Sequence, residues 1–342
     1  MSLRELLDHD DADHVLQGLE LLASSEADWT DLLRDVRFEE EAFRDHRLNE
    51  TWGQLLGWKN PVNLLQLLSQ AQAGSPGADL RDAVTSLQLK ASGELDFLVG
   101  FRRLRRLNVD GGTEWNPTSV ALPQGLSLTA LSATVASHTL KRLSGFEELD
   151  LTVTKSDPVT PEAVEGLLER NPLRVLRLKQ LGYGERTDLT GIDFPAGLKS
   201  LSLGRFTVAS EGLSAQDLRL EHCIVKGPAL WELPALTQVF HMDDCPRMPN
   251  TLLIGPESML RSLSLSLDED FAESFFSKLV IDSASQLTKV YVNACAGWDI
   301  YYRGTLPQLN SVSHGAGQYG SFTVHTEDLQ SAPKAPSALR KG

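Results

Sequence analysis

One leucine phrase, present twice between residues 172 and 206, constrains what this chain can fold into more than any other feature. Leucines that alternate with polar residues predict a short strand with one buried face. A strand this short cannot bury its leucines alone, so it needs an equivalent strand stacked on each side. The spacing therefore predicts a solenoid. The two copies, 25 residues apart, are Leu173-x-x-Leu176-x-Leu178 and Leu198-x-x-Leu201-x-Leu203.

Variants of this phrase recur from about residue 83 to about residue 325. Successive copies lie 17 to 27 residues apart, close to the period of about 20–29 residues at which one strand and its return segment repeat. We expect a strand at each copy. The last two apolar positions of the eleven candidate repeats are Leu87/Leu89, Leu107/Val109, Leu131/Ala133, Leu149/Leu151, Leu176/Leu178, Leu201/Leu203, Leu218/Leu220, Val239/His241, Leu263/Leu265, Val290/Val292 and Val312/His314.

The pattern resembles the leucine-rich repeat superfamily, in an irregular form typical of bacterial members. In that family a buried Asn or Cys stands three residues after the closing leucine. Cys223 stands three residues after Leu220, and Cys295 stands three residues after Val292. The resemblance implies an α/β solenoid, a leucine-rich repeat horseshoe with a parallel β-sheet on its concave face.

The repeat around residue 240 has two possible registers. Our assignment makes His241 its closing position, which places Phe240 on the exposed face. Cys245 stands three residues after Met242, however, and the cysteine rule would turn Phe240 and Met242 inward instead. A slip of one residue exchanges the two faces of a strand, so both registers stay open.

The block before the repeats, residues 1–72, predicts helices that cap the open edge of the first repeat. A breaker-rich linker is expected at 73–82, followed by the repeats at 83–325. The tail at 326–342 lacks an apolar pattern and is expected to be disordered. The domain organisation is thus a helical N-terminal cap, a linker, a solenoid and a tail.

Two intervals of 27 residues leave room for a helix between strands. Thr160 precedes Pro161 and two glutamates, which predicts a capped helix over 160–170. A second helix is expected over 270–279. The shorter intervals predict extended or 3₁₀ return segments.

Composition places few limits on this reading. Hydrophobic residues make up 41% of the chain, but no apolar run approaches the 18 or so residues that cross a bilayer. The first residues lack the basic and apolar regions of a secretory signal. Three cysteines are too few for a disulfide framework and suit a reducing compartment. We therefore expect a cytoplasmic protein.

The net charge of −14 is concentrated at the N-terminus. Residues 1–72 carry six Lys/Arg against fifteen Asp/Glu, a balance of −9, and the remainder carries 26 against 31, a balance of −5. An acidic chain without a basic stripe argues against nucleic acid or an anionic membrane as the main partner. A basic protein partner is compatible with it.

Three motifs suggest chemistry, but each has a simpler structural interpretation. Gly315–Gly320 spells G-x-G-x-x-G, yet the next residues predict a strand where a dinucleotide site needs a helix. His222, Cys223, His241 and Cys245 could surround zinc, but Cys223 fits a buried repeat position. The acidic residues near Asp10 suit a helix N-terminus better than a calcium loop. We predict no metal, no cofactor, no catalytic residue and no enzymatic activity.

The outward residues of the predicted strands form the candidate site. Arginine and aromatic side chains are enriched where proteins bind one another. The residues predicted to bind a partner on the concave face are Asp150, Arg177, Lys179, Arg219, Glu221, Phe240, Tyr291 and Trp298, the last from the loop after its strand.

We therefore expect a non-enzymatic scaffold that binds a partner protein. One alternative is an inhibitor or immunity-type protein that occludes a basic enzyme or toxin. A further alternative is an enzyme with its site in residues 1–72, where His, Cys and Ser are not clustered.

Overall fold

A computed structural model describes most of the chain, and it divides into two compact units. Unit 1 comprises Met1–Thr139 and Gly145–Thr154, and unit 2 comprises Leu140–Ser144 and Lys155–Gly342. The protein is α/β, with ten parallel strands in its long sheet, four from unit 1 and six from unit 2. The described residues are 1–24, 29–45, 48–90, 93–110, 112–113, 116–117, 120–154, 158–182, 185–266, 278–282, 286–293, 298–302 and 322–325.

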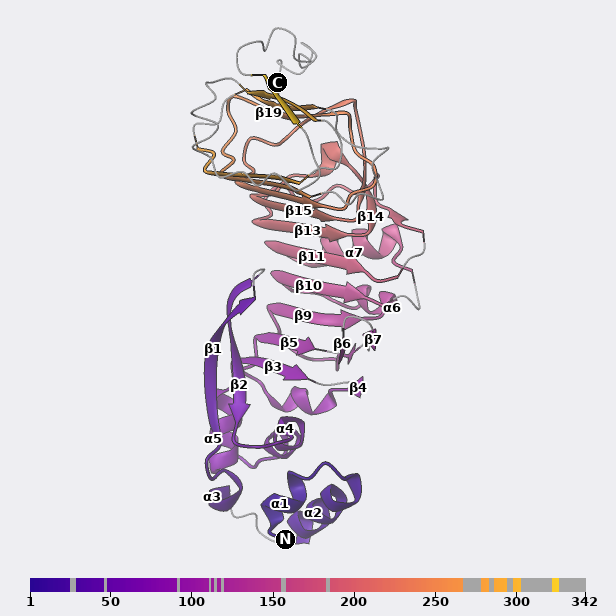
Figure 1. The fold of residues 1–342 in the computed structure, drawn as a ribbon. Coiled ribbons are helices and arrows are strands. Elements are labelled where there is room, and N and C mark those ends of the chain that lie inside the picture. The colour runs from indigo at the N-terminus through magenta and orange to yellow at the C-terminus, as the bar shows by residue number, and fades with distance from the viewer. Residues whose placement is uncertain are drawn as a thin grey trace. The chain divides into compact units, whose positions relative to one another are not determined.

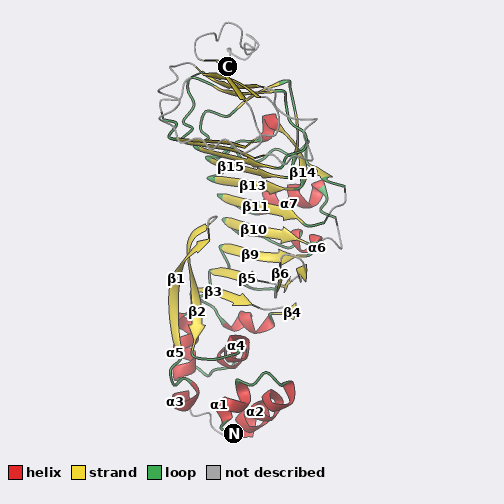
Figure 2. Cartoon of the chain, in the orientation of Figure 1, coloured by secondary structure: helices red, strands yellow, loops and turns green. Residues whose placement is uncertain are grey.

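Five helices belong to the first part of unit 1 (Figure 2). The first begins with a capping box, in which the Ser2 hydroxyl accepts from the Glu5 N–H and the Glu5 carboxylate accepts from the Ser2 N–H. In the described ranges no helix is long and apolar enough to cross a membrane. The helices are α1 (Leu3–Leu7), α2 (Ala12–Ser24), α3 (Trp29–Leu32), α4 (Pro61–Ser69) and α5 (Pro76–Ala83).

The expectation that all of residues 1–72 are helical is wrong for an antiparallel hairpin (Figure 1). Strand β1 (Arg37–Asp45) pairs with β2 (Leu48–Leu56). A Cβ at Gly53 would lie 2.2 Å from the Phe38 ring, so this glycine lets the aromatic ring cross the neighbouring strand. Such pairing depends on contacts between strands, which a search for helical periodicity does not detect.

The segment predicted as a breaker-rich linker, 73–82, is largely helix α5 instead. Pro76 occupies the first turn, where a proline is tolerated, and the Ser75 hydroxyl accepts from the Ala78 N–H at 3.2 Å. The division between the two compact units falls later, among the strands of the long sheet.

Unit 1 contributes four strands to the long sheet, in the order β10-β9-β5-β3. Leu87, Leu107, Leu131 and Leu149 are buried and lie on successive strands in register, as the leucine phrase predicts. The strands are β3 (Ser86–Lys90), β5 (Arg106–Asp110), β9 (Ala130–Val135) and β10 (Glu148–Val153). Short elements between them are β4 (Gly93–Glu94), η1 (Asp96–Gly100), β6 (Gly112–Thr113), β7 (Asn116–Pro117), β8 (Val120–Ala121) and α6 (Ser137–Leu140).

Unit 2 contributes six strands, all parallel, in the order β22-β20-β18-β15-β13-β11 (Figure 1). Their buried and partly exposed residues alternate, which is the pattern of a strand with one packed face. The strands are β11 (Val175–Gln180), β13 (Ser200–Gly204), β15 (Asp217–Glu221), β18 (Val239–Asp243), β20 (Ser262–Ser266) and β22 (Lys289–Asn293). Each coincides with a predicted repeat.

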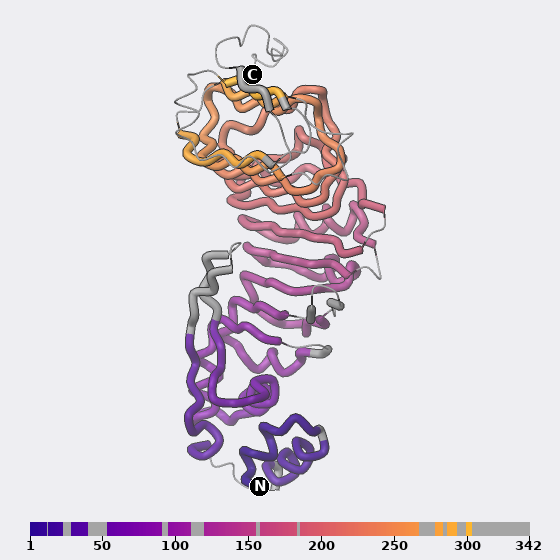
Figure 3. The backbone as a smooth tube through the Cα atoms, in the orientation of Figure 1, coloured from indigo at the N-terminus to yellow at the C-terminus, as the bar shows by residue number. Residues whose placement is uncertain are grey.

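The return segments of unit 2 form further layers (Figure 3 traces their path). Helix α7 (Pro161–Arg170) is capped by Thr160, as predicted, and η2 (Ser210–Gly212) is a 3₁₀ turn. A three-stranded parallel sheet contains β12 (Thr187–Asp188), β14 (Phe206–Ala209) and β16 (Ile224–Lys226). A five-stranded parallel sheet contains β17 (Leu230–Glu232), β19 (Thr251–Ile254), β21 (Lys278–Ile281), β23 (Trp298–Tyr302) and β24 (Phe322–His325).

These segments agree with the expected extended and 3₁₀ returns, with one correction. Lys278 begins β21, so the predicted second helix cannot extend to residue 279. The strand expected after the glycine motif is confirmed as β24. The glycine motif at 315–320, Cys295, the repeat at 312–314 and the tail at 326–342 lie outside the described residues.

Strand β18 adopts the register indicated by its cysteine. Phe240 pairs with Leu218, and Met242 pairs with Leu220; both Phe240 and Met242 are fully buried. The assignment of Val239 and His241 as the inward positions is therefore wrong, and so is the exposed position given to Phe240. The set Phe240/Met242 is wholly apolar, whereas the other set holds the polar His241 and Asp243 beside Val239. The observed register therefore also follows the alternation of hydrophobicity.

A left-handed turn follows three successive strands of unit 2. Arg205, His222 and Asp244 have φ of 68°, 51° and 46°. Their N–H groups donate to the carbonyls at the ends of the next strands, Glu221, Asp243 and Ser266, at 2.8 to 2.9 Å. The residue after each turn is buried, and in two of the three it is a cysteine. These turns explain the inward position predicted for Cys223.

Candidate functional site

The partly exposed face of the six strands in unit 2 is the candidate site. One residue per strand forms what we call the central row, in the order Arg177, Ser202, Arg219, His241, Ser264 and Tyr291. Neighbouring members stand about 4.8 Å apart, as paired strands do. The first five are half-buried, and Tyr291 is 36% exposed, so its ring is the most accessible side chain of the row.

Two further rows flank the central row. The first flank contains Asp217, Val239, Ser262 and Lys289, and the second contains Lys179, Gly204, Glu221, Asp243 and Ser266. The three rows together carry four Lys/Arg (Arg177, Lys179, Arg219 and Lys289) and three Asp/Glu (Asp217, Glu221 and Asp243). This face is therefore almost neutral, although the whole chain carries −14.

Arg219 is paired with an acidic residue of its own strand. Its Nε and Nη2 donate to the two carboxylate oxygens of Asp217 at 3.0 and 3.1 Å. Both side chains are between a quarter and a third exposed. A bidentate pair fixes the orientation of the guanidinium plane.

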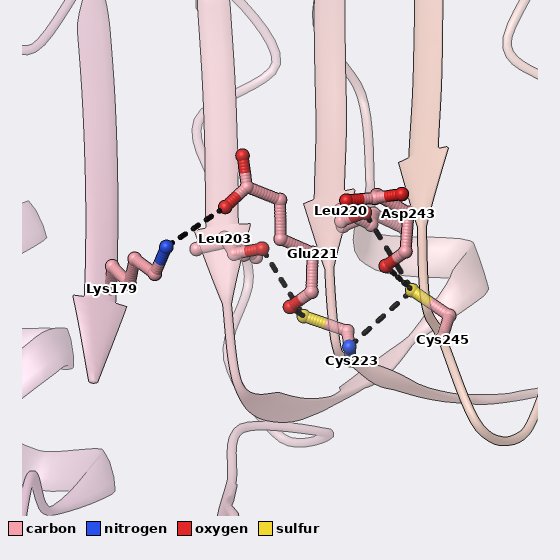
Figure 4. Close-up of polar contacts among 7 residues, drawn as sticks. All are labelled: Lys179, Leu203, Leu220, Glu221, Cys223, Asp243 and Cys245. Carbon is pink, nitrogen blue, oxygen red and sulfur yellow. Dashed lines mark hydrogen bonds and ion pairs between the residues drawn. The ribbon is translucent and has the colours of Figure 1, made fainter. Parts of the chain in front are cut away.

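Lys179 and Glu221 form an ion pair that spans a strand (Figure 4). Lys179 lies in β11 and Glu221 in β15, with Gly204 of β13 between them in register. A Cβ on Gly204 would lie 2.8 Å from Lys179 Cγ. The glycine thus leaves room for the lysine stem to cross β13, and Nζ reaches Glu221 Oε2 at 3.3 Å.

The structure brings five of the eight predicted site residues together on this face. They are Arg177, Lys179, Arg219, Glu221 and Tyr291. Asp150 is half-buried in β10, which belongs to unit 1.

The other two predicted aromatic residues do not lie on this face. Phe240 is buried and packs edge-on against Trp231, with ring centroids 5.4 Å apart. Trp298 begins β23 of the five-stranded sheet and does not belong to a loop. Phe240 was misplaced because the prediction used the wrong register of β18. Trp298 was misplaced because the five-stranded sheet was not predicted.

Among the polar residues that β18 contributes to the face, sequence reasoning missed two, His241 and Asp243. Both follow from the observed register of β18, in which they alternate with the buried Phe240 and Met242. The signal that could have found them is Cys245, three residues after Met242.

Cys223 and Cys245 lie beneath the face, in the turns after β15 and β18 (Figure 4). The Cys223 N–H donates to Cys245 Sγ at 3.3 Å, and the Cys223 thiol donates to the Leu203 carbonyl at 3.2 Å. Burial raises the pKa of Cys223 to about 11, and it also raises the pKa of Cys245 well above its usual range. Both are structural thiols with little thiolate at neutral pH.

This burial predicts slow alkylation. With iodoacetamide at about pH 8, a thiol of pKa 11 is only about 0.1% thiolate, so Cys223 and Cys245 should stay unmodified while the chain is folded. Peptide mass spectrometry measures each site separately, and the same chain in guanidinium chloride serves as the fully reactive control. Rapid modification of Cys223 in the folded chain would contradict the buried position.

Among the described residues, no group of three or more His, Cys, Asp or Glu is placed to hold a metal ion. The face presents hydrogen-bonding groups, an aromatic ring and side chains of both charges, at the regular spacing of paired strands. These are means of binding a polypeptide surface.

Comparison of the chain with protein-family models, with curated proteins and with solved structures finds no match.

Proposed function

We propose that the chain is a non-enzymatic leucine-rich repeat scaffold that captures a partner protein on the central row and its two flanks. The main support is the central row itself. Six side chains on six hydrogen-bonded strands include two arginines, a histidine and an exposed tyrosine. Arginine and tyrosine supply much of the binding energy in protein interfaces, and the sheet beneath holds them in place.

The charge balance of the face bears on the choice of partner. Four basic against three acidic residues give this surface no strong preference for a basic protein. Two of the four basic residues are already paired with acidic residues of the same face: Arg219 with Asp217, and Lys179 with Glu221. We therefore favour a partner of mixed polarity over the alternative of an inhibitor that occludes a basic enzyme.

The free thiols support a proposal for the cellular compartment. Cys223 and Cys245 are both unpaired and adjacent, which suits a reducing environment. We propose the cytoplasm.

Replacement of Arg177, Arg219 and Tyr291 by alanine should weaken partner capture at least tenfold, because each such residue contributes about 1 to 2 kcal/mol when it is central to an interface. Affinity capture from the native host, with quantitative mass spectrometry, compares the triple variant with the unchanged chain. A double variant of exposed residues away from the six strands, Glu211→Ala with Glu257→Ala, is the matched control.

Circular dichroism should show all three proteins equally folded. Equal capture by the triple variant and the control would refute this surface as the binding site. For the inhibitor alternative, the association rate should fall steeply with salt, since steering by opposite charges is screened. A rate independent of salt would exclude that alternative.

A further inference from the structure

A cavity of about 440 Å³ lies in unit 1, where the hairpin, helix α4 and strand β3 meet. Its apolar wall includes Leu55 of β2, and Val62 and Leu65 of α4. Its other wall is formed by four consecutive residues, 87–90, which are nearly the whole of β3. Ligand sites of proteins commonly enclose about 300–1,000 Å³ and combine such apolar walls with a few polar groups.

Strand β3 has an open hydrogen-bonding edge on this side. It ends the order of its sheet, and within the described ranges β5 is its only paired neighbour. The Arg106 N–H of β5 donates to the Thr85 carbonyl at 3.2 Å. In a parallel ladder the residues of one strand alternate in direction. The backbone groups of Leu87 and Leu89 therefore face β5, and those of Gln88 and Lys90 face the open edge.

The hairpin covers only the beginning of this edge. A Cβ at Gly53 of β2 would lie 2.5 Å from the Ser86 carbonyl oxygen, so the two backbones touch there. One residue further on, Gln54 Nε2 donates to Gln88 Oε1 at 3.1 Å. Beyond this contact, Gln88, Leu89 and Lys90 line the cavity. Figure 1 shows β3 near β2 and α4.

The charges around the cavity favour an acidic ligand. Lys59 and Lys90 line it with exposed side chains, and Asp10 is the acidic residue of the lining. The Asp8 carboxylate lies outside the lining and accepts from the backbone N–H groups of Lys59 and Asn60 at 3.0 and 2.8 Å. Two ammonium groups against one carboxylate leave a net positive rim.

We propose that this cavity binds a short, extended, acidic peptide segment of a partner protein, which adds a strand to the open edge of β3. The peptide backbone pairs with Gln88 and Lys90, one apolar side chain enters between Leu55 and Val62, and an acidic side chain lies near the two lysines. This site lies in unit 1 and is independent of the face proposed above.

The first test selects hexapeptides from a displayed random library on the full chain and measures the enriched sequences by fluorescence anisotropy. We expect sequences that alternate apolar with acidic residues. Methylation of alternate backbone nitrogens in such a peptide should weaken binding at least tenfold, because it removes the donors that pair with β3. Failure to enrich any sequence would overturn the proposal.

Variants of the chain then locate the site. Val62→Trp fills the cavity and Gln88→Pro removes an edge donor that is not part of the ladder with β5, so each should weaken binding at least tenfold. Gln88→Ala keeps that donor and should bind as the unchanged chain does. Lys59→Glu with Lys90→Glu should reverse the selection towards basic peptides.

Circular dichroism should show that each variant is folded. Val62→Trp and Gln88→Pro test different features of the site, the cavity volume and the backbone donor, so misfolding of one would leave the other as a test. Peptide affinity that is unchanged in both would refute the site. Equal competition by N-acetylglutamate and by the peptide would refute an extended-strand ligand in favour of a small carboxylate.

Discussion

Leu201→Asp should unfold unit 2, whereas Ser202→Asp, one residue away, should leave it intact. Leu201 is fully buried in β13, between Leu176 of β11 and Leu218 of β15. The substitution loses the free energy gained by burying a leucine side chain, about 1.5–3 kcal/mol, and places an unpaired carboxylate in an apolar layer. The total, at least about 5 kcal/mol, equals the whole stability of many domains.

Ser202 is the matched control because it lies on the same strand as Leu201 but its side chain is on the opposite, partly exposed face. Its neighbours in register are Arg177 and Arg219, so an added carboxylate would stand between two guanidinium groups. We expect a change within about 0.5 kcal/mol, as for most surface substitutions. Urea denaturation followed by circular dichroism compares the two variants, and equal destabilisation would show that the inside and outside of β13 are assigned wrongly.

Phe240→Ala should be the second most damaging change, with a loss of about 3–5 kcal/mol, typical of a buried phenylalanine. The ring is fully buried and meets the Trp231 indole edge-on, so its removal leaves a cavity between β18 and β17. His241→Ala on the adjacent, half-buried position should cost less than about 1 kcal/mol.

This pair of variants separates the two registers of β18. Denaturation midpoints in urea, together with intrinsic tryptophan fluorescence, report both the stability and the surroundings of the indole. Should His241→Ala prove the more damaging substitution, the register inferred from Val239 and His241 would have to be restored.

The ten strands of the long sheet could be predicted because the leucine phrase is a local signal. Most of these strands show two inward aliphatic residues with a polar residue between them, as in Leu218, Arg219 and Leu220. The same alternation predicts which residues form the central row, so most of the candidate site could be predicted from the sequence. The exception is β18, where Val239 was taken as an inward position although the apolar pair Phe240 and Met242 indicates the observed register.

The elements that escaped prediction lack the repeated leucine phrase. The hairpin places Arg37 opposite Leu56, and the five-stranded sheet pairs Leu252 with Leu279. Strands such as β19, Thr251–Ile254, are buried throughout and show no alternation. A short apolar run of this kind fits a strand or a buried helix equally well, which is why the second sheet and the position of Trp298 were missed.

The glycine at position 204, which has no side chain, has an evolutionary consequence. A one-base change from glycine to alanine would push the stem of Lys179 off the sheet and release both this cation and the anion of Glu221. If the face binds a partner as proposed, that partner would have to match two more charges, while the aliphatic interior would stay unchanged. Specificity in descendants of this gene can thus diverge through a single methyl group, with no loss of the scaffold that carries it.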